Sequence, residues 1–119
     1  LLATESAPSW PTNIHDCKTA VRWLRANAKR LQIDVDHIGV IGGSAGGHLT
    51  SLLALTGPND GLDPTAPWGE FSCAVQCAVP MYGAGNVNDG KNARSMLGKT
   101  VEEAPELYRL ASRISHADA

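Results

Sequence analysis

The stretch from residue 37 to residue 49, HIGVIGGSAGGHL, constrains the fold of this chain more than any other. Apolar residues precede a turn in which four glycines surround one serine, and a second apolar run follows. This pattern predicts a buried strand, a tight reversal and a helix. Gly42, Ser44 and Gly46 stand at the spacing G-x-S-x-G. So sharp a reversal strains Ser44 and brings the two glycines together, and we expect a Cβ on either Gly42 or Gly46 to clash.

This spacing is typical of a nucleophile elbow. The reversal lifts the Ser44 hydroxyl clear of the sheet edge, and the first amides of the following helix have no partner within it. The N–H of Ala45 then faces the serine and can donate to an oxyanion. A turn that only binds an anion is the alternative, but a phosphate loop favours a lysine or a G-x-G-x-x-G pattern, which this stretch lacks. The sequence therefore predicts Ser44 as a nucleophile and Ala45 as an oxyanion-hole donor.

The rest of the chain predicts an α/β fold. Apolar residues at spacings of three and four indicate a helix from about Pro11 to Arg30, and its other face is expected to be mostly solvated. Residues 57–71 are expected to form a polar loop, and 71–80 a second strand, with Tyr82 lining a pocket or packing at the core edge. Helix, strand, helix and strand in this order imply parallel strands flanked by helices. The basic residues on the solvated face are Lys18, Arg22, Arg25, Lys29 and Arg30.

Composition narrows the classes of partner and cofactor. The 119 residues carry a formal charge of −2, which gives no electrostatic reason to expect a nucleic acid or an anionic membrane as partner. No apolar run approaches the length of a membrane span. Cys17, Cys73 and Cys77 have no metal-site spacing, and we expect buried thiols, with the last two on one face of the second strand. Neither a metal nor an organic cofactor is implied.

A serine nucleophile needs a base and an orienting carboxylate. In folds with this elbow, the acid and then the histidine follow the serine along the chain. Asp89 and His116 come in that order and are a candidate pair, although partners beyond Ala119 are the favoured explanation. His48 lies one helical turn after Ser44, beside the helix rather than over the hydroxyl. We therefore expect it to make a packing or hydrogen-bond contact.

Residues 13–28, 33–34 and 42–49 together resemble bacterial esterases of the BD-FAE-like group. These α/β-hydrolases include feruloyl and acetyl xylan esterases and relatives of the hormone-sensitive lipase family. Residues 106–112 are similar to the segment before the strand that leads to that family's catalytic aspartate. The resemblance implies that Ser44 is the nucleophile and Ala45 an oxyanion donor, with the His-Gly-Gly-Gly loop, the aspartate and the histidine outside residues 1–119. Arg113 stands where such sequences usually have proline.

We therefore expect residues 1–119 to be the central part of a single α/β-hydrolase domain, with a fold incomplete at both ends. Its expected activity is that of a serine carboxylic-ester hydrolase on small-molecule or carbohydrate esters, including acetylated or feruloylated plant polysaccharide. A related acyl hydrolase, such as a peptidase or formamidase, and a non-catalytic homologue that kept the fold are the alternatives. The sequence does not specify the acyl group, the alcohol, the oligomeric state or the compartment.

Overall fold

The computed structural model describes residues 3–88 and 90–117. Strands β1 (Gly39–Gly43) and β2 (Cys77–Met81) pair in parallel, with Gly39 opposite Cys77 and Gly43 opposite Met81. The expected arrangement of parallel strands and flanking helices is confirmed. The helices are α1 (Thr12–Ala26), α2 (Ala28–Leu31), α3 (Ala45–Leu55), α4 (Lys91–Leu97), α5 (Pro105–Ala111) and the short 3₁₀ helix η1 (Arg113–His116).

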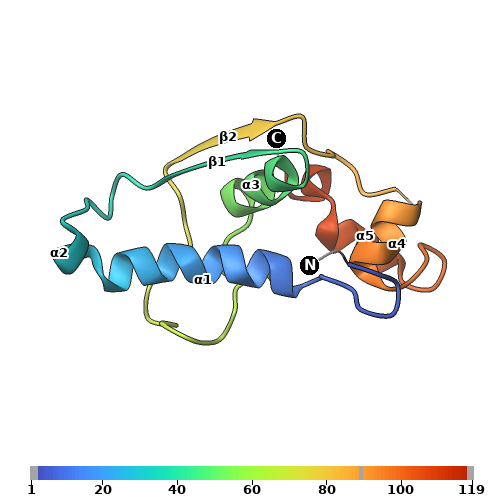
Figure 1. The fold of residues 1–119 in the computed structure, drawn as a ribbon, viewed down its shortest axis with the longest axis horizontal. Coiled ribbons are helices and arrows are strands. Elements are labelled where there is room, and N and C mark those ends of the chain that lie inside the picture. The colour runs from blue at the N-terminus through green and yellow to red at the C-terminus, as the bar shows by residue number, and fades with distance from the viewer. Residues whose placement is uncertain (1–2, 89, 118–119) are drawn as a thin grey trace.

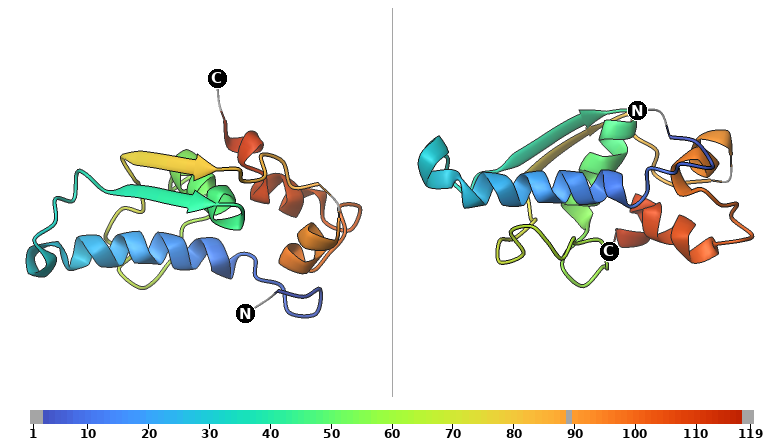
Figure 2. Two further views of the ribbon diagram at one scale, coloured as in Figure 1. Left: turned by 45° about the horizontal axis from the view of Figure 1, so that its top comes forward. Right: turned by 60° about the horizontal axis from the view of Figure 1, so that its bottom comes forward.

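Helix α3 is the central element of the fold. It packs against both strands and against α1, and it also contacts η1. Figure 1 shows the two strands side by side along the top, with α3 beneath them and α1 farther below. Helices α4 and α5 lie beyond the carboxyl ends of the strands, as the turned views in Figure 2 also show. On the strand face away from α3, Ile41 and Val79 are 67% and 46% exposed.

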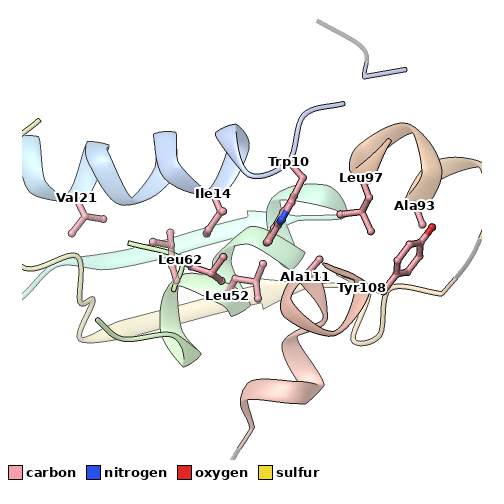
Figure 3. Packing of buried hydrophobic residues seen from close by; sticks show 10 residues of the cluster. Trp10, Ile14, Val21, Leu52, Leu62, Ala93, Leu97, Tyr108 and Ala111 are labelled. Atoms are coloured by element: carbon pink, nitrogen blue, oxygen red, sulfur yellow. The ribbon is translucent and has the colours of Figure 1, made fainter. Parts of the chain in front are cut away.

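The hydrophobic core is continuous from α1 to the last helices. Ile14 of α1 and Leu52 of α3 are fully buried and face each other across the helix pair (Figure 3). Trp10, just before α1, packs in the same cluster as Leu97 of α4 and Tyr108 of α5. Burying each such large side chain contributes about 1.5–3 kcal/mol. The core therefore connects α3 with α1 and with the helices α4 and α5.

The predicted helix from Pro11 to Arg30 is interrupted in the structure. Helix α1 ends at Ala26, and α2 starts after Asn27. The side-chain amide of Asn27 donates to the carbonyl oxygen of Trp23 at 2.9 Å. An asparagine that bonds the backbone in this way competes with the helical hydrogen bonds, and an amphipathic pattern alone does not reveal it.

The second strand begins later than the sequence predicts, at Cys77 instead of residue 71. Residues before it bond locally, as when the Ala74 N–H donates to Ser72 Oγ at 3.0 Å. Cys73 consequently lies outside the strand and is buried, and this burial raises the pKa of its thiol. Cys77 is exposed on the strand face away from α3. The prediction that both thiols are buried on one face is therefore wrong, because the alternation of a strand does not extend to residue 73.

Two of the basic residues predicted to be solvated are in fact buried. Lys18 is completely inaccessible, and its Nζ lies 2.6 Å from Asp63 Oδ1 and 3.2 Å from the carbonyl oxygen of Thr56. Arg22 is 5% exposed and donates to the carbonyl oxygens of Pro64 and Phe71. The loop after α3 thus folds over α1 and supplies the acceptors that two buried cations require.

We expect Asp63→Asn to lower the free energy of unfolding by about 3 kcal/mol, because it leaves the buried Lys18 ammonium without an anion. Glu106→Gln is the matched control. It breaks an exposed ion pair with Arg109 of 2.8 Å, for which a change within about 0.5 kcal/mol is expected. Urea denaturation of both variants measures the difference. Equal midpoints for the two variants would show that the Lys18 pair does not stabilise the fold.

Candidate active site at the β1–α3 junction

Ser44 is the single residue between the end of β1 and the start of α3. Its backbone angles, φ 54° and ψ −119°, lie in a region that residues with a Cβ rarely adopt. On one side the Ser44 N–H donates to the carbonyl oxygen of Met81 at 3.0 Å, continuing the strand ladder. On the other side its carbonyl oxygen accepts from the His48 N–H at 3.1 Å, beginning the helix. Strand and helix bonds together hold Ser44 in the strained conformation that the glycine-rich turn predicts.

The two glycines of the motif differ in their surroundings. A Cβ added to Gly42 would lie 2.6 Å from the carbonyl carbon of Gly46 and 2.8 Å from Thr50 Oγ1. A Cβ added to Gly46 would meet no atom within 4 Å. The expectation that a side chain at either position clashes therefore holds for Gly42 and is wrong for Gly46. The approach is one-sided because the Cβ of Gly42 points at the first turn of α3, whereas that of Gly46 points into open space.

A second close contact of backbones was not predicted from the sequence. A Cβ on Gly47 would collide with the carbonyl oxygen of Met81, and one on Gly83 would lie 2.5 Å from the carbonyl carbon of Gly47. The first turn of α3 therefore packs directly on the chain that leaves β2. The sequence signals for this contact were Gly47, in the second glycine doublet of the elbow, and Gly83, two residues after the second strand and 36 residues after Gly47.

Ser44 and Ala45 are exposed and lie at the mouth of an open pocket of about 680 Å³. The N-terminal turn of α3 forms one wall, and its unpaired amides, including that of Ala45, point toward this end of the helix. Residues 82–88 form the opposite wall, while α4 and the chain before α1 close the far side. Among the described residues that line the pocket there is no Lys, Arg, Asp or Glu. The described lining therefore offers amide groups, hydroxyl groups and the His48 imidazole, but no carboxylate, lysine or arginine.

Tyr82 is at the rim of this pocket and not at the edge of the core. It is 82% exposed, has a positive φ of 39°, and follows β2 directly. A Cβ on Gly43 would lie 2.6 Å from the Tyr82 hydroxyl, so the phenol extends over the backbone just before Ser44. Of the two roles considered for Tyr82, the structure supports pocket lining.

Neither His48 nor His116 is placed as a base for Ser44. The Nε2 of His48 donates to the carbonyl oxygen of Ala111 at 2.6 Å, in a buried hydrogen bond of the expected kind. His116 Nε2 donates to the carbonyl oxygen of Leu110 at 2.9 Å, and its Nδ1 lies 3.9 Å from Asp60. Asp60 follows the far end of α3, which is about 16 Å long. The structure thus does not bring His116 to Ser44, and Asp89 lies outside the described residues.

Within residues 3–88 and 90–117, no group of three or more His, Cys, Asp or Glu side chains is arranged to hold a metal ion. No helix in the same residues has both the length and the apolar character of a membrane span. The described site offers the accessible Ser44 hydroxyl at the N-terminus of α3, beside a pocket whose described lining has no Lys, Arg, Asp or Glu.

Comparisons with known proteins agree with this geometry. Esterase LipQ of Mycobacterium tuberculosis is 34% identical over 117 residues, which cover 91% of this chain and 27% of LipQ. The probable carboxylic ester hydrolase LipM of the same organism is 48% identical over 77 residues, covering 63% of this chain and 17% of LipM. A solved truncated form of a carbohydrate esterase from gut microbiota superposes with a TM-score of 0.79 at 25% identity.

That superposition covers 92% of this chain and 46% of the solved chain. The present chain therefore spans about a quarter of LipQ and less than half of the carbohydrate esterase. The family model described as BD-FAE matches residues 3–119. This match extends through both strands, the elbow and all the helices described above, and the chain belongs to the BD-FAE family, with a fold of the α/β-hydrolase type.

Proposed function

We propose that this chain is the central part of a serine carboxylic-ester hydrolase domain and that Ser44 is its nucleophile. The observation that carries the proposal is the position of Ser44, which is exposed, strained and held between β1 and α3 at the mouth of a pocket. The names of LipQ and LipM, both ester hydrolases, support the reaction class. That residues 1–119 are one part of a longer domain is supported by the small share of each relative that the chain spans.

In the proposed reaction, Ser44 Oγ attacks the carbonyl carbon of the ester and its proton passes to a general base. The carbonyl oxygen becomes an oxyanion, to which the Ala45 N–H donates a hydrogen bond. Collapse of this intermediate breaks the bond to the alcohol, which leaves with the proton and gives an acyl-enzyme. Water then attacks the acyl carbon, releases the carboxylic acid and restores the serine hydroxyl.

The general base is not proposed to be His48 or His116. His48 Nε2 donates to a backbone carbonyl, and His116 is beside Asp60 at the opposite end of α3. We propose that the base, its carboxylate partner and a second oxyanion donor come from parts of the domain outside these 119 residues. The residues described here then supply the nucleophile, one oxyanion amide and two walls of the pocket.

The neutral lining supports uncharged small-molecule or carbohydrate esters as substrates. Asn13, Asn88 and Asn92 line the pocket and bring side-chain amides to it. Such amides can donate to the hydroxyl groups of a sugar or to an ester carbonyl. The carbohydrate esterase among the structural neighbours supports the same substrate class. A panel of esters, amides and formamides would separate an esterase from a peptidase or formamidase.

Replacing Ser44 by alanine in the full-length protein should lower kcat for p-nitrophenyl acetate by about three orders of magnitude or more, since the acyl-enzyme can no longer form. Ser6→Ala, at an exposed serine near the N-terminus, is the control and should leave kcat unchanged. Steady-state hydrolysis followed at the absorbance of p-nitrophenol gives the comparison. Turnover retained by Ser44→Ala would remove the assignment of the nucleophile.

The elbow geometry makes a separate prediction for the two glycines of the motif. Gly42→Ala should slow acylation of Ser44 by a fluorophosphonate probe at least about tenfold, because the new methyl group displaces the first turn of α3. Gly46→Ala has open space for its methyl group and should raise the free energy of unfolding by about 0.5–1 kcal/mol. If the two variants label equally slowly, the one-sided contact is not what positions Ser44.

A further inference from the structure

Residues 111–114, at the junction of α5 and η1, bond to both walls of the pocket from behind; we call them the clamp segment. Two of its bonds reach α3. The carbonyl oxygen of Ala111 accepts from His48 Nε2 at 2.6 Å, and Arg113 Nη1 donates to Ser51 Oγ at 3.2 Å. Ser51 in turn donates to the carbonyl oxygen of Gly47 at 3.0 Å, in the first turn of the helix. The clamp segment is thus connected to the helical wall that carries Ser44.

The other bonds of the clamp segment reach the opposite wall. The Val87 N–H donates to Ser112 Oγ at 2.9 Å, and the Ile114 N–H donates to the carbonyl oxygen of Gly85 at 3.1 Å. Arg113 Nη2 donates to the carbonyl oxygen of Gly83 at 3.4 Å. Ser112 Oγ also lies 3.0 Å from Asn86 Oδ1 and 2.8 Å from the Tyr108 carbonyl oxygen, and gives its one proton to either.

The two walls depend on the clamp segment to different extents. Helix α3 is also held by the strands, by the core and by the backbone contact at Gly47. Residues 84–88 belong to no helix or strand, and among the described residues all their hydrogen bonds go to residues 112–114. Loss of the clamp would therefore release this wall and leave the elbow in place.

We propose that the clamp segment positions the wall formed by residues 84–88, through Ser112 and Ile114 directly and through Arg113 at Gly83, where that wall begins, and so determines how tightly the site holds its ester. The inference rests on the proposed function of Ser44. Arg113 is a positioning residue, since it bonds to Ser51 and to Gly83 but does not line the pocket. Its planar guanidinium reaches acceptors on two different elements at once, which the single ammonium of a lysine cannot do in the same geometry.

The test compares Arg113→Ala and Arg113→Lys with wild type in the full-length protein, using p-nitrophenyl butyrate as substrate. Active sites are counted by titration with a fluorophosphonate, so that kcat refers to folded enzyme only. We expect Arg113→Ala to raise KM about five- to twentyfold with kcat per titrated site within about twofold of wild type, and Arg113→Lys to fall between them. Ser112→Ala removes the acceptor of the Val87 N–H and should change KM in the same direction.

Arg109→Ala is the matched control, because Arg109 lies four residues earlier, is exposed and, among the described residues, pairs with Glu106 alone. Its KM should equal that of wild type. A KM of Arg113→Ala within about twofold of wild type would overturn the proposal. The proposal would also be overturned if the variant only lowers the fraction of enzyme that the fluorophosphonate titrates, because that result indicates a merely structural role. Failure of the proposed function is distinct, since it appears as turnover that survives Ser44→Ala.

Discussion

The fold of the site depends on backbone packing against backbone without side chains between. Gly42 touches the first turn of α3, and Gly47 touches the chain that leaves β2 through Gly83. Only at these short separations can one residue, Ser44, join a strand to a helix while its N–H still bonds to Met81. A methyl group at Gly42 or Gly47 would push α3 away from the sheet. Ser44 keeps its strained backbone conformation because the core fixes the elements on both sides of it.

This arrangement has an electrostatic consequence. A helix that starts immediately after the serine presents its unpaired amides and the positive end of its dipole to the same point in space as the hydroxyl. Among its described residues the pocket beside it has no Asp, Glu, Lys or Arg, and these amides are groups that can stabilise negative charge there. Shape and electrostatics at Ser44 therefore have one origin, which is the short junction between β1 and α3.

Features that arise within a few residues were predictable from the sequence, and features that need distant partners were not. The elbow depends on Gly42, Ser44 and the helix that follows, all within one local stretch. The burial of Lys18 depends on Asp63, 45 residues later, and no helical pattern reveals such a partner. The late start of β2 has the same cause, since a strand extends only as far as its neighbour permits. His116 was a candidate base because it follows Asp89 in the expected order. The order of residues in the sequence does not give their distance in the fold.

The same division between local and distant contacts separates the two parts of the pocket. Neighbours in the chain set the tight turn at the nucleophile, which the contacts with Met81 and Gly83 then hold in place. The wall of residues 84–88 bonds to residues about 25 to 30 positions later, namely the Ser112 side chain and the Ile114 backbone, and Arg113 bonds to Gly83 just before this wall. We therefore expect a substitution at Arg113 to act on this wall through Gly83 more than on Ser44, which the strands and the core also hold.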